Sequence, residues 1–71
     1  MSDSQKHFKV MKRPVVESIT GLSRSSIYSK MDDGTFPRNI KLSERSVGWL
    51  EHEVQEWLKN RVVASRQGAA Q

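Results

Sequence analysis

Residues 20–34 read TGLSRSSIYSKMDDG, and this stretch decides the fold. A glycine such as Gly21 adopts the positive φ of a helix C-cap without strain, and Ser23, two residues later, can cap the start of another helix. The stretch therefore predicts two helices that meet at a tight turn. The second helix is expected to run from Ser23 or Arg24 to Asp32, just before the next glycine.

The second helix is predicted to have one buried and one open face. Ile27 and Met31 form an apolar pair at i and i+4, so the core should lie on their side of the helix. At about 100° per residue, Ser25 and Ser29 point almost directly away from that core. An open face of short hydroxyl side chains, with Arg24 at its leading end, is well suited to close approach by another molecule.

The sequence also predicts the bounds of the first helix, a segment upstream of the helix pair and a hairpin downstream of it. The first helix is expected to start at Pro14, because a first turn tolerates the missing N–H, and to end at Thr20. Upstream of it, residues 8–12 alternate apolar and basic side chains, which indicates a short strand or an extended arm. A β-hairpin with a loop of about three or four residues is predicted downstream, because apolar residues recur at every second position around a polar break. These apolar residues are Ile40, Leu42, Val47 and Trp49.

The most regular helical pattern runs from Glu51 to about Val63. Its acidic residues come early and its basic residues late, an order that complements the helix dipole. Trp49 and Trp57 are expected to face a common core, which favours packing over a role in stacking on bases.

The length of 71 residues allows one small domain. We expect a flexible N-terminal tail over 1–7, a folded domain over 8–63 and a flexible C-terminal tail over 64–71. The chain has no cysteine, which suits a reducing cytoplasm. No stretch reaches the roughly 20 apolar residues that cross a bilayer, so a membrane location is not expected.

The charge balance points to a polyanion as the partner. The net charge is +4 and the pI is near 9.9. No metal site is expected, because His7 and His52 lie 45 positions apart and lack a ligand spacing. No cofactor or small-molecule substrate is expected either, because the sequence has no glycine-rich phosphate loop and no recognisable catalytic constellation. Asp32 and Asp33 are neighbours on a helix, so their carboxylates point about 100° apart and cannot form an acid–base pair. We therefore expect a protein that is not an enzyme.

The predicted order of helix, tight turn, helix, hairpin and helix is that of a winged helix-turn-helix, mainly α with a small β wing. In such folds the second helix enters the major groove of double-stranded DNA and the wing touches the backbone or the minor groove. A helix about 10–12 Å wide fits that groove.

Residues 20–61 carry a resemblance to a known family. The opening TGLSRSSIY, the turn GTFP, the wing KLSERSVGW and the helix EVQEWL are together similar to the AlpA family of phage-type regulators. The resemblance implies a small MerR-like, excisionase-like winged-helix domain that binds DNA. It also implies that Arg24, Ser25 and Ser26 open the recognition helix and that Lys41, Arg45 and Ser46 belong to the wing.

The residues expected to contact DNA form two groups, each of which has a plainer alternative. On the helix they are Arg24, Ser25, Ser26, Tyr28, Ser29 and Lys30, and on the wing Lys41, Arg45 and Ser46. Tyr28 could instead pack against the core, and Lys30 could simply be solvated. Lys41 and Arg45 could be ordinary charges at a hairpin edge.

A basic cluster upstream of the first helix has two readings as well. It comprises Lys6, Lys9, Lys12 and Arg13 and contains no acid, so it could follow the DNA backbone or belong to a solvated tail.

Three functions remain open at this level. The first is a cytoplasmic, sequence-specific transcriptional regulator of phage or mobile-element genes. The second is an excisionase, in which several copies bend an attachment site for an integrase. The third is a protein-interaction module that uses the last helix and does not bind DNA. The sequence specifies neither the operator, nor the sign of regulation, nor the number of copies on DNA.

Overall fold

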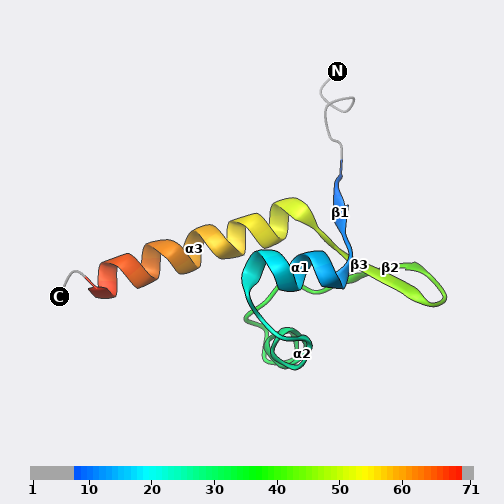
Figure 1. Cartoon of the computed structure of the whole chain (residues 1–71), viewed down its shortest axis with the longest axis horizontal. Coiled ribbons are helices and arrows are strands. Elements are labelled where there is room, and N and C mark those ends of the chain that lie inside the picture. Colours follow the sequence, from blue (N-terminus) through cyan, green and yellow to red (C-terminus); the bar gives the residue numbers. More distant parts are fainter. Residues whose placement is uncertain (1–7, 70–71) are drawn as a thin grey trace, which may run out of the picture.

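The computed structural model describes residues 8–69, and its helices and strands follow the predicted order (Figure 1). This order confirms a mainly α fold with a β wing, a winged helix-turn-helix. The N-terminal tail predicted over 1–7 lies outside the described residues. The elements are β1 (Val10–Met11), α1 (Arg13–Thr20), α2 (Arg24–Asp32), β2 (Ile40–Ser43), β3 (Ser46–Leu50) and α3 (Glu51–Ala69).

The turn between α1 and α2 forms as the sequence predicts. Gly21 has φ = 76°, and its N–H donates to the Glu17 carbonyl at 2.8 Å, which closes α1. Ser23 is the N-cap of α2, where its hydroxyl oxygen accepts from the Ser26 N–H at 3.1 Å. These two caps are local, so they fix where α1 ends and α2 begins.

The wing is the hairpin of β2 and β3, and β1 extends it to a three-stranded antiparallel sheet in the order β1-β3-β2. Val10 pairs with Leu50 and Met11 with Trp49, so the segment over 8–12 includes a strand rather than only an extended arm. The predicted loop of three or four residues is wrong. Ser43 and Ser46 pair with each other, which leaves a turn of only Glu44 and Arg45.

The error in loop length has a physical reason. The polar residues around the turn suggested that the strands had already ended, yet strands at a solvated hairpin tip need no apolar side chain. A β-bulge between Lys41 and Ser43 also shifts the register there. Leu42 is consequently 42% exposed, although the alternation placed it on the buried face.

The core lies between the sheet and the helices. Its buried residues are Met11, Val16, Ile27, Met31, Phe36, Trp49 and Val54. Both tryptophans belong to this region, but only Trp49 is completely buried, while Trp57 packs at the edge. Each indole N–H donates to the segment that leads into the wing: Trp49 to the Pro37 carbonyl at 3.1 Å and Trp57 to the Thr35 carbonyl at 2.6 Å.

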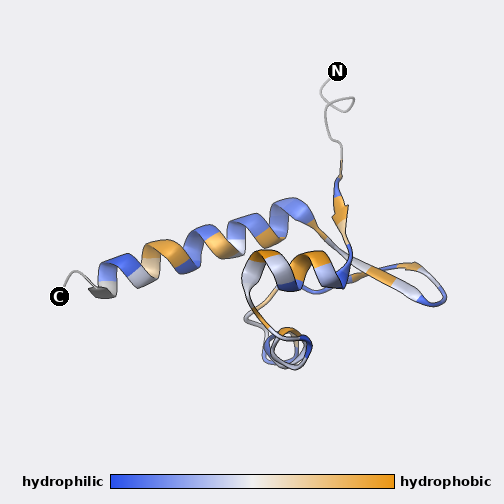
Figure 2. Cartoon of the chain, viewed as in Figure 1, coloured by the Kyte–Doolittle hydropathy of each residue, from blue (hydrophilic) through white to orange (hydrophobic). Residues whose placement is uncertain are grey.

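The last helix is longer than predicted. Instead of ending near Val63, α3 continues to Ala69, so residues 64–69, assigned from the sequence to a tail, are helical. Alanine, arginine and glutamine favour helix without any apolar period, whereas the prediction relied on that period. The distal half of α3 projects from the body, and hydrophobic bands continue along it (Figures 1 and 2). Within residues 8–69, no helix is both long enough and apolar enough to cross a membrane.

Candidate nucleic-acid interface

The outward face of α2 carries the predicted hydroxyl side chains. Ser25 and Ser29 are exposed, whereas Ile27 is completely buried and Met31 is 8% exposed. The predicted orientation of the helix is therefore confirmed. Short side chains leave a shallow depression of about 240 Å³ on this face, which Ser25, Ser26, Ser29 and Lys30 line. Another molecule can approach the α2 backbone closely there.

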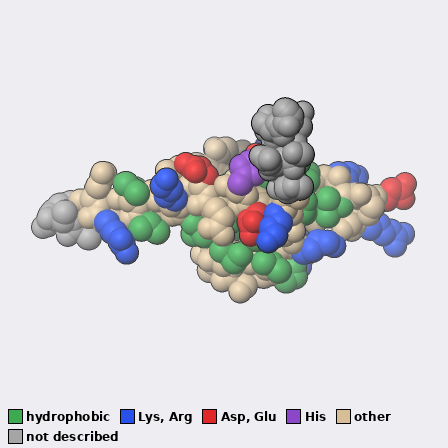
Figure 3. Space-filling model, turned by 90° about the horizontal axis from the view of Figure 1, so that it is seen from above, with side chains coloured by type: hydrophobic (Ala, Val, Ile, Leu, Met, Phe, Trp, Pro, Cys, Tyr) green, Lys and Arg blue, Asp and Glu red, His purple; other side chains and the backbone are tan. Residues whose placement is uncertain are grey.

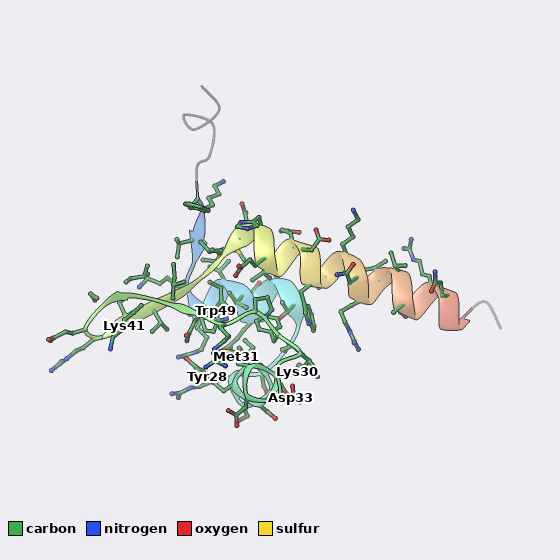
Figure 4. The ribbon with its side chains drawn as sticks, turned by 180° about the vertical axis from the view of Figure 1, so that it is seen from behind. Tyr28, Lys30, Met31, Asp33, Lys41 and Trp49 are labelled. Atoms are coloured by element: carbon green, nitrogen blue, oxygen red, sulfur yellow. The ribbon has the colours of Figure 1, made fainter. Side chains whose placement is uncertain are left out.

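Arg24 and Tyr28 stand one helical turn apart at the edge of this face. The guanidinium carbon of Arg24 lies 5.9 Å from the centre of the Tyr28 ring, and the ring meets Trp49 edge-on at 6.1 Å. Figure 4 shows Tyr28 and Met31 on the side of α2 toward Trp49. The Tyr28 ring thus packs against the core, which was the alternative to a DNA contact, and the Arg24 guanidinium lies over the face of the ring.

Ser26 lines the depression and is also hydrogen-bonded to Ser23, the N-cap residue of α2. Its N–H is bonded to the Ser23 hydroxyl oxygen, and its own hydroxyl oxygen accepts from the same group at 3.1 Å. The side chain is half-buried. Ser26 is therefore less available to a ligand than Ser25 and Ser29, because capping α2 already engages it.

The predicted wing residues form a second group, on a different element. Lys41 and Arg45 are exposed on the hairpin, and Ser46 is half-buried at the start of β3. Figure 4 labels Lys41 on the wing. The Ser46 hydroxyl oxygen accepts from the Lys12 ammonium at 2.9 Å. Seen from above, Lys and Arg side chains gather over the wing, and others are spaced along α3 (Figure 3).

A basic hollow lies where α1 meets the wing, and the sequence did not predict it. It has a volume of about 180 Å³ and brings Lys12 and Arg13 next to Arg45. Its lining is completed by Pro14, Ser46 and Val47. Arg13 donates through Nε to the Glu17 carboxylate at 2.9 Å, which leaves its terminal nitrogens for other acceptors. The basic run before α1 was the available signal, but nothing in the sequence placed it beside the wing.

The remaining basic residues upstream do not join this hollow. Lys9 is exposed before β1, and its carbonyl accepts from the Glu51 N–H at 2.7 Å, so this part of the chain is tied to the start of α3. Lys6 lies outside the described residues.

Asp33, at the C-terminal end of α2, has a lowered pKa. The Thr35 hydroxyl donates to the Asp33 carboxylate at 2.7 Å and the Thr35 N–H donates at 3.1 Å, and these bonds hold the pKa of Asp33 below its usual value. The carboxylate stabilises the turn at Gly34, where φ is 83°. Among residues 8–69, no three histidine, aspartate or glutamate side chains are grouped so that they could hold a metal ion.

Comparison with known proteins places this architecture in a family. Residues 9–62 match the family described as Prophage CP4-57 regulatory protein (AlpA). The chain belongs to the AlpA family. This membership confirms the resemblance carried by the turn, wing and final helix motifs, and the AlpA match covers β1 through most of α3.

Two proteins are similar to this chain in sequence. A protein of Escherichia coli (strain K12), described as the DNA-binding transcriptional activator AlpA, is 37% identical over 59 residues, which cover 75% of this chain and 84% of the relative. The uncharacterized protein ORF88 of Enterobacteria phage P4 is 35% identical over 60 residues, which cover 84% of this chain and 68% of the relative.

Proposed function

We propose that this AlpA family protein binds double-stranded DNA in a sequence-specific manner and regulates transcription of phage or mobile-element genes. The observation that carries the proposal is the open, hydroxyl-lined face of α2, with Ser25 and Ser29 outward and Ile27 fully buried behind them. The relative from E. coli, described as a DNA-binding transcriptional activator, supports the same role. Such a regulator acts in the cytoplasm, with no cofactor and no catalytic step.

In this proposal α2 enters the major groove. The short side chains of its outer face bring the helix close to the base edges, and the serine hydroxyls can donate or accept there. Arg24 stands at the first turn, where its guanidinium can form paired hydrogen bonds to a guanine edge. Packing of Arg24 over the Tyr28 ring limits its rotamers and so lowers the entropic cost of that contact.

The wing and the basic hollow supply phosphate contacts. Lys41 and Arg45 can pair with backbone phosphates on one side of the groove. The hollow between α1 and the wing can hold one phosphate group among Lys12, Arg13 and Arg45. The contact between Lys12 and Ser46 keeps this lysine beside the wing. These contacts set position and affinity, whereas α2 reads sequence.

The test begins with selection of bound duplexes from a random library, followed by fluorescence anisotropy with the selected site and a scrambled site. Arg24→Ala is expected to weaken the selected site by about 5- to 150-fold and to reduce discrimination against the scrambled one. Arg45→Ala and Lys12→Gln are expected to weaken both sites alike and to lower the salt dependence by about one counterion each.

Gln55→Ala serves as the control, because Gln55 is an exposed polar residue on α3 that lies outside α2, the wing and the basic hollow. It is expected to bind as the wild type does. If Arg24→Ala and Arg45→Ala both bound the selected site as tightly as the wild type, this assignment of the interface would be wrong.

A second candidate is an excisionase role that uses the same surface. Each chain carries one recognition helix, α2, and one such helix reads only a few base pairs. Several copies side by side on an attachment site would extend the recognised length and bend the DNA for an integrase. An excision assay with the cognate integrase tests this: the protein should be required for excision, and Arg24→Ala should abolish its effect.

A further inference from the structure

A groove lies beside the start of α3, on the side of the sheet away from α2. Its volume is about 710 Å³ and its apolar lining comes from Pro37, Ile40 and Leu50. Ile40 pairs with Gly48, and Leu50 lies two residues further along β3, so both face opposite to Trp49. Because Trp49 faces Tyr28 of α2, an occupant of this groove leaves the proposed DNA surface open.

Acidic side chains form the wall of this groove that α3 contributes. Glu53 and Glu56 line it, one turn apart, together with His52. Glu56 is exposed and Glu53 is half-buried. Arg38 and Asn39 complete the lining, and the Arg38 guanidinium donates to the Met31 carbonyl at 3.5 Å. The groove thus pairs an apolar floor with two carboxylates against one cation, and the excess of carboxylates fits a segment that carries apolar and basic side chains.

The distal half of α3 has the complementary character. Val62 is 44% and Val63 46% exposed, and both belong to the distal half of α3. This half of the helix projects from the body (Figure 1). The sequence contains no acid after Glu56, while Lys59 and Arg66 are exposed cations on this half. This segment, residues 59–67, is called the overhang below.

The overhang cannot fill the groove of its own chain. Groove residue Glu53 and overhang residue Val63 belong to the same continuous helix, and ten residues of helix separate them by about 15 Å. Folding back would require α3 to break where the sequence has neither proline nor glycine. The two complementary surfaces can therefore meet only between copies of the chain.

We propose that the overhang of one copy docks in the groove of a second copy, and that the exchange is reciprocal. Antiparallel α3 helices place the basic half of each against the acidic half of the other, so Arg66 of one copy approaches Glu53 of the other. The same two surfaces then serve both copies, which closes a two-fold dimer. The inference is independent of the proposed function, because the dimer forms without DNA.

Sedimentation equilibrium on the full chain without DNA, over a range of concentrations, tests the dimer. Wild-type protein is expected to show a monomer–dimer equilibrium. The groove variant Glu53→Lys/Glu56→Lys and the overhang variant Lys59→Glu/Arg66→Glu should each raise the dissociation constant at least about tenfold. Circular dichroism should show unchanged helix content, because three of these four side chains are exposed and Glu53 is half-buried.

An equimolar mixture of the two variants is the decisive arm. In the mixed dimer, the wild-type overhang of the groove variant meets the wild-type groove of the overhang variant. The other contact joins the lysine-bearing groove to the glutamate-bearing overhang, so its charges are reversed on both sides and still attract, and dimerisation should return. Glu44→Lys, a charge reversal at the exposed wing turn, is the matched control and should dimerise as the wild type does. A monomeric wild type, variants that dimerise normally, a mixture that stays monomeric, or assemblies that grow beyond two copies would each overturn the proposal.

Discussion

Gly48→Ala should destabilise this domain through a steric clash inside the wing. Gly48 sits in the middle of β3, where both neighbouring strands approach it, and its φ is not positive. A methyl group there would collide with Val10 Cγ1 from β1, and would lie 3.1 Å from Leu42 Cδ1 and 3.2 Å from the Met11 carbonyl oxygen. The clash therefore involves both flanking strands and one backbone atom that cannot rotate away.

The size of the effect follows from two opposing terms. Replacing glycine by alanine reduces the entropy of the unfolded chain, which stabilises the fold by about 0.4–1 kcal/mol. Overpacking costs typically 1–3 kcal/mol, and the Met11 carbonyl cannot relieve it by a rotamer change. The net loss should be about 1–2 kcal/mol. A domain of this size loses about 4–8 °C of Tm for each kcal/mol.

Thermal and urea unfolding, followed by circular dichroism, measure this loss in a double-mutant cycle. Val10→Ala removes the colliding methyl group, so Gly48→Ala should cost less in the Val10→Ala background, with a coupling of about 1 kcal/mol. Gly21→Ala is the matched comparison. An added Cβ at Gly21 meets nothing within 4 Å, yet the positive φ should cost about 1–2 kcal/mol that Val10→Ala does not relieve.

The reasoning would be refuted if Gly48→Ala were as stable as the wild type. It would also be refuted if its cost were the same with and without the Val10 methyl groups, because the loss would then not come from contact with β1.

Three further outcomes follow from hydrogen bonds in the structure. Ser23→Ala removes the acceptor for the Ser26 N–H and should cost about 0.5–2 kcal/mol in urea unfolding, with Ser23→Gly closer to the wild type. Trp57→Phe leaves the Thr35 carbonyl without its indole donor and should cost about 1–2 kcal/mol in the same assay. Because the pKa of Asp33 is lowered, its carboxylate stabilises the fold above pH about 4, and this stabilisation is lost as the pH falls through the lowered pKa. Asp33→Asn should therefore have a lower Tm than the wild type at neutral pH and the same Tm in strong acid.

The turn and the orientation of α2 could be predicted from sequence because their causes are local. A glycine C-cap, a serine N-cap and an apolar pair one turn apart act within a dozen residues. The open face of α2 followed directly, since Ile27 and Met31 leave only one side for Ser25 and Ser29. The same local pattern missed the capping duty of Ser26, because a serine at that position fits either role.

The features that the sequence left open or missed depend on pairs of residues far apart in the chain. β1 is a strand only because β3 lies beside it, and Lys12 reaches Ser46 across 34 positions. The basic hollow at the wing needs both of these contacts, so no periodicity in the sequence could locate it. The prediction of the length of α3 failed for another reason. Ala64, Arg66 and Gln67 favour helix, although Gly68 does not, and residues 64–69 have no apolar period to detect.

Trp49 and Trp57, whose indole N–H groups both donate to carbonyls between Thr35 and Pro37, give this protein an intrinsic fluorescence signal. Trp49 is sealed from solvent while Trp57 is reached by it, and Arg61 lies 5.6 Å from the Trp57 ring centre. Their fluorescence should therefore differ in emission maximum and in access to a soluble quencher. The segment links the end of α2 to the wing, so a change in its conformation should alter the surroundings of both indoles and could be followed without an added label.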